Sequence, residues 1–95
     1  VDNPAALREL ADRLKEKIKS GIVVMGSAKG PKAFLIVGVT KDLTDRFHAG
    51  NIIKQIAPIV GGGGGGRSDM AQAGGTQPAK LEEALEKARN IIANN

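Results

Sequence analysis

The sequence contains no cysteine, tryptophan or tyrosine, and its only aromatic residues are Phe34 and Phe47. The absence of cysteine excludes disulfide bonds and thiolate metal sites, and it fits a reducing, cytoplasmic location. No apolar run approaches the roughly 20 residues that a membrane-spanning helix needs. The longest, at residues 34–39, has the length of a strand. The first twenty residues are charged and amphipathic, without the apolar segment of a signal peptide. We therefore expect an aliphatic core and no membrane partner.

Length and charge indicate one small basic domain. Ninety-five residues are enough for one modest core and too few for two. Apolar residues make up 41% and charged residues 25%, which is typical of a globular chain rather than a disordered one. The formal net charge is +4, and the excess lies in the first two thirds of the chain. Such an excess is compatible with nucleic-acid contact but is also common in proteins that bind none.

The first half of the chain predicts a helix followed by a β-hairpin. Asn3 can cap a helix that starts at Pro4 and ends at Ser20 and Gly21, with the glycine as a left-handed cap. We interpret the basic residues of this helix as a solvated face. Two apolar runs, at 22–25 and 33–40, predict antiparallel strands joined by a loop at 27–32. The second run is apolar almost throughout, which predicts a central strand covered on both faces. The buried stripe of the helix would comprise Leu7, Leu10, Ala11, Leu14 and Ile18.

The second half predicts a helix at 48–60, a third strand at 68–73 and a last helix at 79–94. Pro58 has no N–H group and should distort the end of the first of these helices. We interpret His48, the only histidine, as a surface or capping residue, because no ligand cluster accompanies it in the sequence. A right-handed crossover would place the third strand parallel to the second. The expected fold is α/β of the mixed α+β type, with about three strands in a small mixed sheet and the order α-β-β-α-β-α.

A run of six glycines, residues 61–66, opens the segment GGGGGGRSDMAQAGG at 61–75. In nucleotide-binding folds such glycines precede a helix N-terminus, whereas this run follows a helix and leads into a strand. The sequence also has no GxxxxGK[ST] string, so we reject an ATP or NAD site. Two interpretations stay open. The glycines could line a backbone groove with Arg67 as its charge, or they could end the helix, permit close helix–sheet packing and leave Arg67 paired with Asp69.

Three ordered segments carry a family resemblance. They are VTKDLTDR at 39–46, AGNII at 49–53 and the glycine-rich segment at 61–75. Together they resemble the C-terminal, DHH-associated "C-Ala" domain of alanyl-tRNA synthetases. The resemblance implies a single domain over residues 1–95. Residues 1–20 would form a connecting helix and residues 21–95 the globular part.

In that family the domain is non-catalytic, contacts the tRNA elbow and helps to present one tRNA to the aminoacylation and editing sites. The implied partners are alanine-specific tRNA, the other domains of the synthetase and a second copy in a homodimer. The domain itself would need no cofactor, whereas the whole enzyme would use ATP, Mg and zinc.

Two alternatives belong to other functional classes. A related domain closes a family of DHH-type phosphoesterases, whose signature resembles GGGHxxAAG and carries a histidine. This chain has glycine and then Arg67 in that region, which favours the synthetase. The second alternative is a structural dimerisation module, suggested by the amphipathic terminal helices.

We expect no catalytic or metal-ligating residue in the chain. The candidate site residues are all RNA contacts. The candidate phosphate partners are Lys29, Lys32 and Lys41. The candidate contacts of the glycine-rich segment are Gly63, Gly64, Gly65, Gly66, Arg67 and Gln72.

Overall fold

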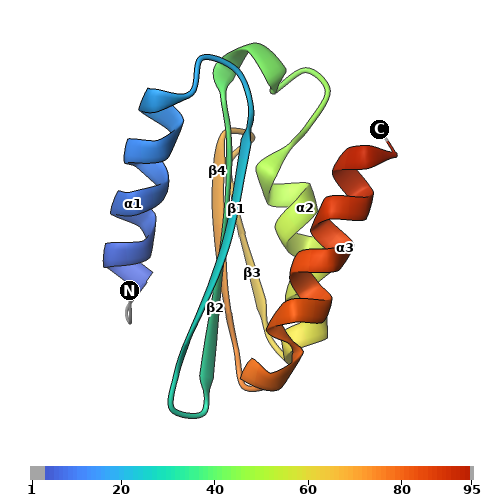
Figure 1. Cartoon of the computed structure of the whole chain (residues 1–95). Helices are drawn as coiled ribbons and strands as arrows, with labels where there is room; N and C mark the ends of the chain where they lie inside the picture. The colour runs from blue at the N-terminus through green and yellow to red at the C-terminus, as the bar shows by residue number, and fades with distance from the viewer. Residues whose placement is uncertain (1–3, 95) are drawn as a thin grey trace.

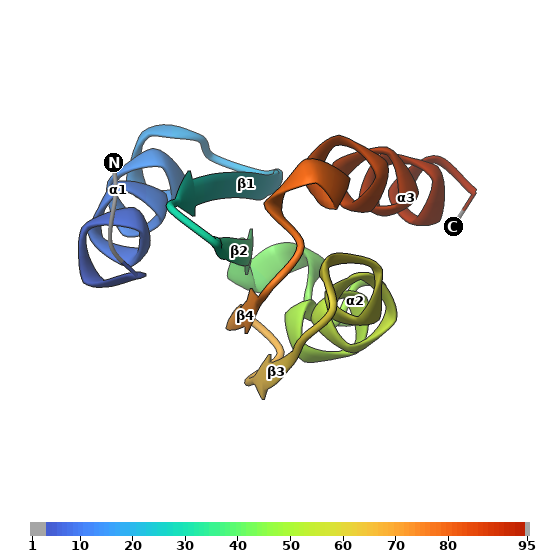
Figure 2. The same ribbon diagram turned by 90° about the horizontal axis from the view of Figure 1, so that it is seen from below.

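Strand β2 (Lys32–Val39) runs through the middle of the molecule, with strands on both sides and helices on both faces. The computed structural model describes residues 4–94. Helix α1 (Pro4–Lys17) lies on one face of the sheet, and α2 (Ala49–Ile56) and α3 (Leu81–Ala93) lie on the other (Figures 1 and 2). None of the helices within residues 4–94 is long and apolar enough to cross a membrane.

Four antiparallel strands form the sheet, in the order β1-β2-β4-β3. The outer strands are β1 (Ile22–Lys29) and β3 (Gly63–Gly66), and β4 (Met70–Gly75) lies between β2 and β3. The expected α/β architecture is confirmed. The structure has one strand more than the expected three, and the order is α-β-β-α-β-β-α.

The predicted parallel pairing is wrong. The expected third strand, at 68–73, corresponds to β4, which pairs with β2 in antiparallel register and places Ile36 opposite Gln72. The glycine run forms the additional strand β3, which sequence propensity did not indicate because glycine is depleted in strands. After the crossover through α2, strand β3 does run in the same direction as β2. The two do not pair, because β4 lies between them.

The apolar sequence of β2 is explained by burial on both of its faces, as predicted. Leu35, Val37 and Val39 join the main core beneath α2 and α3. Ile36, on the opposite face, joins a smaller cluster with Leu7 and Ala11 of α1. Because side chains alternate along a strand, a strand covered on both sides must be apolar at consecutive positions.

Helix α1 ends at Lys17, earlier than expected. The left-handed cap predicted at Gly21 is wrong: among the described residues a positive φ occurs only at three other glycines. The Gly21 N–H instead donates to Thr40 Oγ1 at 3.0 Å. Leu10, placed in the buried stripe by its spacing, is 36% exposed because the helix turns Leu7 and Ala11 toward the sheet. The proposed Asn3 cap lies outside the described residues.

The β1–β2 hairpin is tighter than predicted. Strand β1 continues through residues 27–29, and Lys29 lies opposite Lys32, so the turn consists of Gly30 and Pro31 alone. Gly30 has φ 57°, a left-handed conformation that glycine adopts without a steric penalty.

The predictions for the middle helix are confirmed. His48 is exposed and caps α2, since its Nδ1 accepts the N–H of Asn51 at 3.2 Å. The last turn, which contains Pro58, is the 3₁₀ helix η2 (Ala57–Val60). Gly61 then ends the helix in a left-handed conformation with φ 72°.

Thr40 ties the start of β1 to the 3₁₀ helix η1 (Lys41–Leu43). Its hydroxyl accepts the Gly21 N–H and donates to Asp42 Oδ1 at 2.6 Å. Hydrogen bonds from the Ser20 and Thr40 hydroxyls hold the pKa of Asp42 below its usual value.

This lowered pKa predicts an acid-sensitive contribution to stability. The contribution should be complete above the unfolded pKa of about 3.9 and should disappear as the pH falls through the lower folded pKa. We expect the difference in thermal midpoint between wild type and Asp42→Asn to shrink from about pH 6 to about pH 2. A difference that is independent of pH would show that the Asp42 charge contributes nothing.

Candidate nucleic-acid interface

Every second glycine of the run is required by close packing. Strand β3 pairs with β4 so that Gly64 lies opposite Ala73 and Gly66 opposite Ala71. A Cβ atom at Gly62, Gly64 or Gly66 would overlap the facing strand β4. The glycines thus permit close packing, but between the strands β3 and β4, whereas the interpretation from the sequence placed it between helix and sheet.

Packing does not require glycine at the alternate positions, Gly63 and Gly65. A Cβ atom at either would meet no atom within 4 Å among the described residues. The register places Gly65 opposite Gln72 and Gly63 opposite Gly74, on the same face as Phe34 and Ile36. On this face β3 presents only backbone, whereas β4 carries the side chains of Met70 and Gln72.

Helix α1 borders this bare face without covering it. The helix packs mainly on β1 and β2, and β4 and β3 lie farther from it (Figure 2). Two adjoining hollows follow this surface, and both are lined by Gln72. The hollow toward the β3–β4 turn, which we call the arginine pocket, has a volume of about 250 Å³. Its lining includes Arg8, Gly65, Gly66, Arg67 and Gln72.

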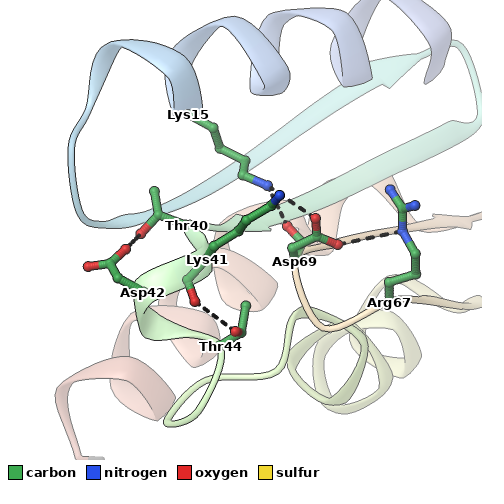
Figure 3. Close-up of polar contacts among 7 residues, drawn as sticks. All are labelled: Lys15, Thr40, Lys41, Asp42, Thr44, Arg67 and Asp69. Atoms are coloured by element: carbon green, nitrogen blue, oxygen red, sulfur yellow. Dashed lines mark hydrogen bonds and ion pairs between the residues drawn. The ribbon is translucent and has the colours of Figure 1, made fainter.

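Arg67 stands on the β3–β4 turn, where Asp69 holds it. Arg67 Nε lies 3.5 Å from Asp69 Oδ1, and 72% of the Arg67 side chain is exposed. Lys15 of α1 reaches the same turn from the opposite direction (Figure 3). Its Nζ donates to the Asp69 carbonyl oxygen at 2.9 Å and lies 3.9 Å from Asp69 Oδ2. The Arg67–Asp69 pair, part of one of the two interpretations left open by the sequence, is present, and α1 supplies a second anchor that the sequence did not reveal.

Helix α2 fixes the turn from the other side of the sheet. The N–H groups of Ala49 and Gly50 donate to the carbonyl oxygens of Ser68 and Arg67 at 2.9 and 3.0 Å. The carbonyl oxygen of Gly66 lies so close that a Cβ atom on Gly50 would be 2.8 Å from it. These two helix N–H groups are therefore hydrogen-bonded to backbone carbonyl oxygens. The cationic group that the turn presents to solvent is the exposed guanidinium of Arg67.

The predicted lysines lie at two ends of the sheet. Lys29 and Lys32 flank the tip of the β1–β2 hairpin, whereas Lys41 follows β2 on η1. The length of β2 separates them by about 23 Å, at about 3.3 Å per residue. Figure 3 shows Lys41 at the Asp69 end. The structure thus groups Gly65, Gly66, Arg67 and Gln72 in one pocket and does not bring all three lysines to it.

Arg8 is a residue of this pocket that the sequence did not indicate. Its place off the buried stripe predicts a residue of the solvated helix face, yet it lines the arginine pocket. Its position directly after the buried Leu7 places it at the border of the helix–sheet contact. Helical spacing alone could not identify that border, because it does not show which strands the helix leaves uncovered.

Comparison with known proteins identifies similar sequences and a similar structure. The family model of the DHHA1 domain matches residues 2–94. Alanine–tRNA ligase of Desulfosudis oleivorans is 64% identical over 92 residues, and that of Natranaerobius thermophilus is 53% identical over 90 residues. These alignments cover 97% and 94% of this chain and 10% of each relative. The chain thus spans about a tenth of the length of these curated relatives.

A solved structure agrees with these sequence matches. The C-Ala domain from Aquifex aeolicus alanyl-tRNA synthetase has a TM-score of 0.88 and 39% sequence identity to this chain. The match covers 94% of this chain and 80% of that one.

The two kinds of glycine predict opposite effects on stability. Gly64→Ala should lower the free energy of unfolding by about 3 kcal/mol, because the methyl group overlaps β4. Gly63→Ala should raise it by about 0.5 kcal/mol, because the methyl group has free space and alanine restricts the unfolded chain. Urea denaturation of both variants measures the difference. Equal destabilisation would contradict the assigned register.

The hydrogen bond from Lys15 to the Asp69 carbonyl oxygen predicts that removing the Lys15 ammonium group lowers stability. Lys15→Met keeps the apolar stem, which lies against Gly38, and removes the charged hydrogen bond to Asp69. We expect the free energy of unfolding to fall by about 1.5–3 kcal/mol, as for other hydrogen bonds to charged groups. Lys17→Met, at an exposed position of the same helix, is the matched control in urea denaturation. Similar values for the two variants would show that the anchor is not stabilising.

Proposed function

This chain belongs to the DHHA1 domain family, and from that premise we propose that it is the C-Ala-type, tRNA-binding domain of an alanine–tRNA ligase. The domain itself binds RNA and catalyses no reaction. The names of its relatives support this assignment. The remaining nine tenths of such an enzyme would carry aminoacylation and editing, with ATP, Mg and zinc as its cofactors, in the cytoplasm.

One observation carries the proposal of an RNA-binding face. Gly63 and Gly65 lack side chains where the protein has space for them. Glycine in a strand interior lowers stability because it has no side chain to pack, and a bare backbone allows a ligand to approach closely. Close packing against β4 accounts for Gly62, Gly64 and Gly66 but leaves these two positions unexplained. A ligand surface on the bare face accounts for them.

The charges at the border of this face favour a nucleic acid. Arg8 and Arg67 line the same pocket as Gly65 and Gln72. A guanidinium group can hold a phosphate through two parallel hydrogen bonds, and its plane can also stack on a base. Asp69 orients the exposed Arg67 without enclosing it. We propose that Arg8 and Arg67 bind phosphates of the tRNA while Gly65, in the same pocket, lies against its backbone.

Recognition of this kind depends on RNA shape and phosphate positions more than on base sequence. It suits the tRNA elbow, a folded corner that different tRNAs share. By holding the elbow, the domain would keep one tRNA attached while its acceptor end moves between the aminoacylation and editing sites. Lys29, Lys32 and Lys41 would add phosphate contacts farther along the sheet. The domain could also form a homodimer, which would be independent of its tRNA contacts.

A titration with tRNA at several salt concentrations tests the proposal. Arg67→Ala should weaken binding about tenfold or more, the effect of losing one charged hydrogen bond. It should also reduce the slope of log affinity against log salt by about 0.9. Gly65→Leu, which fills the open space beside Gln72, should weaken binding without unfolding the domain.

The matched control is Arg89→Ala. Arg89 is 61% exposed and lies on α3, across the sheet from the arginine pocket. Equal losses for Arg67→Ala and Arg89→Ala would indicate attraction to net charge instead of a site. A folded wild-type domain that binds no tRNA and sediments as a dimer would support the structural module instead.

A further inference from the structure

The second hollow on the bare face, which we call the hairpin pocket, differs in chemistry from the arginine pocket. It lies toward the β1–β2 hairpin and has a volume of about 220 Å³. Gln72 is shared by both hollows, and no charged side chain of the described residues lines this one. The residues that matter for its chemistry are Leu7, Phe34, Ile36, Gly63, Gln72 and Gly74.

The fold does not require this pocket to be open. A Cβ atom at Gly63 would meet nothing within 4 Å in the part of the chain that the structure describes. One at Gly74 would touch only the Ala33 carbonyl oxygen, at an ordinary 3.8 Å. Neither glycine has a positive φ that would exclude other residues. The two glycines face each other across β3 and β4, so their missing side chains keep one continuous space free.

The lining suits a flat group with apolar faces and a polar edge. Phe34 and Leu7 supply aromatic and aliphatic surface, and both belong to the cluster between α1 and the sheet. Gln72 is exposed, and its amide can donate and accept hydrogen bonds at the rim. A phosphate would find no cation in this pocket. A nucleobase combines a π-face for stacking with an edge that hydrogen bonds can recognise.

The neighbouring arginines indicate what the base is attached to. Arg8 and Arg67 line the adjoining pocket, and Gln72 stands at the boundary between the two. One strand of RNA lying along β3 would thus meet a base-sized apolar space and, next to it, two cations. This order of apolar and cationic surface matches a base followed by its phosphate. An alternative occupant of the hairpin pocket is an apolar side chain from another part of a longer protein. That occupant would not explain why Arg8 and Arg67 line the adjoining pocket.

We propose that the hairpin pocket holds one nucleobase of the bound tRNA, with Phe34 against the base and Gln72 on its edge. The proposal rests on the proposed tRNA-binding function and adds a base-binding subsite to it. The chain has only two aromatic residues, and Phe34 is the one that lines this pocket and can stack on a base. The other aromatic residue, Phe47, is buried in the main core.

Two pocket variants test the subsite in tRNA titrations. Phe34→Leu retains an apolar side chain and removes the aromatic face. Gly63→Val fills the pocket from a position that has room for a side chain. We expect each to weaken tRNA binding about tenfold, a typical effect of losing one base–aromatic stack. The salt slope should stay at the wild-type value, because no phosphate contact is lost. Arg67→Ala should instead reduce the slope.

The matched control is Ala28→Val, an exposed substitution of similar size near the same hairpin. Its register partner Ala33 belongs to the main core, which places Ala28 on the opposite face of the sheet. Thermal unfolding verifies that each variant is folded. Wild-type affinity in both folded pocket variants would overturn the subsite while leaving tRNA binding intact.

A parallel reduction of the salt slope in the pocket variants would also contradict a base-binding role. If the folded wild type binds no tRNA, the proposed function fails and the subsite fails with it. In amide NMR spectra of the wild type with tRNA, we expect shifts at Gly63, Gly74 and the Gln72 side chain. Unchanged signals at all three would exclude an occupied pocket.

Discussion

The close approach of β3 to β4 is the constraint on which the rest of the structure depends. The facing strand leaves no room for a Cβ atom at Gly62, Gly64 or Gly66, and Gly50 of α2 has only limited space beside the Gly66 carbonyl oxygen. Packing at such short distances brings the N-terminus of α2 to the β3–β4 turn, where its N–H groups meet two carbonyl oxygens. The same packing fixes the position of Arg67. A strand with ordinary side chains would move both the helix and the turn outward.

The turn is also tied to α1, across the sheet. Lys15 donates to the Asp69 carbonyl oxygen, and Asp69 in turn pairs with Arg67. The apolar stem of Lys15 lies against Gly38 of β2, so this glycine too leaves room for a neighbour. Through these contacts α1 and β2 hold the β3–β4 turn, which carries Arg67, in place. In the proposed function, the anchored turn keeps Arg67 at the edge of the bare face before RNA arrives, which lowers the entropic cost of binding.

The glycine run therefore combines two requirements that alternate along one strand. On the face toward α2, protein atoms occupy the space that side chains would need. On the opposite face no atom of residues 4–94 occupies the corresponding space at Gly63 and Gly65, and two hollows of different chemistry adjoin there. The two interpretations that the sequence left open are thus compatible, because successive residues of a strand point to opposite faces. Packing explains one set of glycines, and the proposed RNA contact explains the other.

The sequence by itself determined the helices, the central position of β2, the His48 cap, the distortion at Pro58 and the family of the chain. Each follows from local chemistry or from residue order along one segment. Only the tertiary structure decided that glycines form a strand, that β4 inserts between β2 and β3, and that Arg8 and Phe34 border one open face. Glycine has weak strand propensity, so β3 forms through pairing with β4 and packing against α2. Those contacts join segments distant in sequence, and the local pattern of six identical residues carries no information about them.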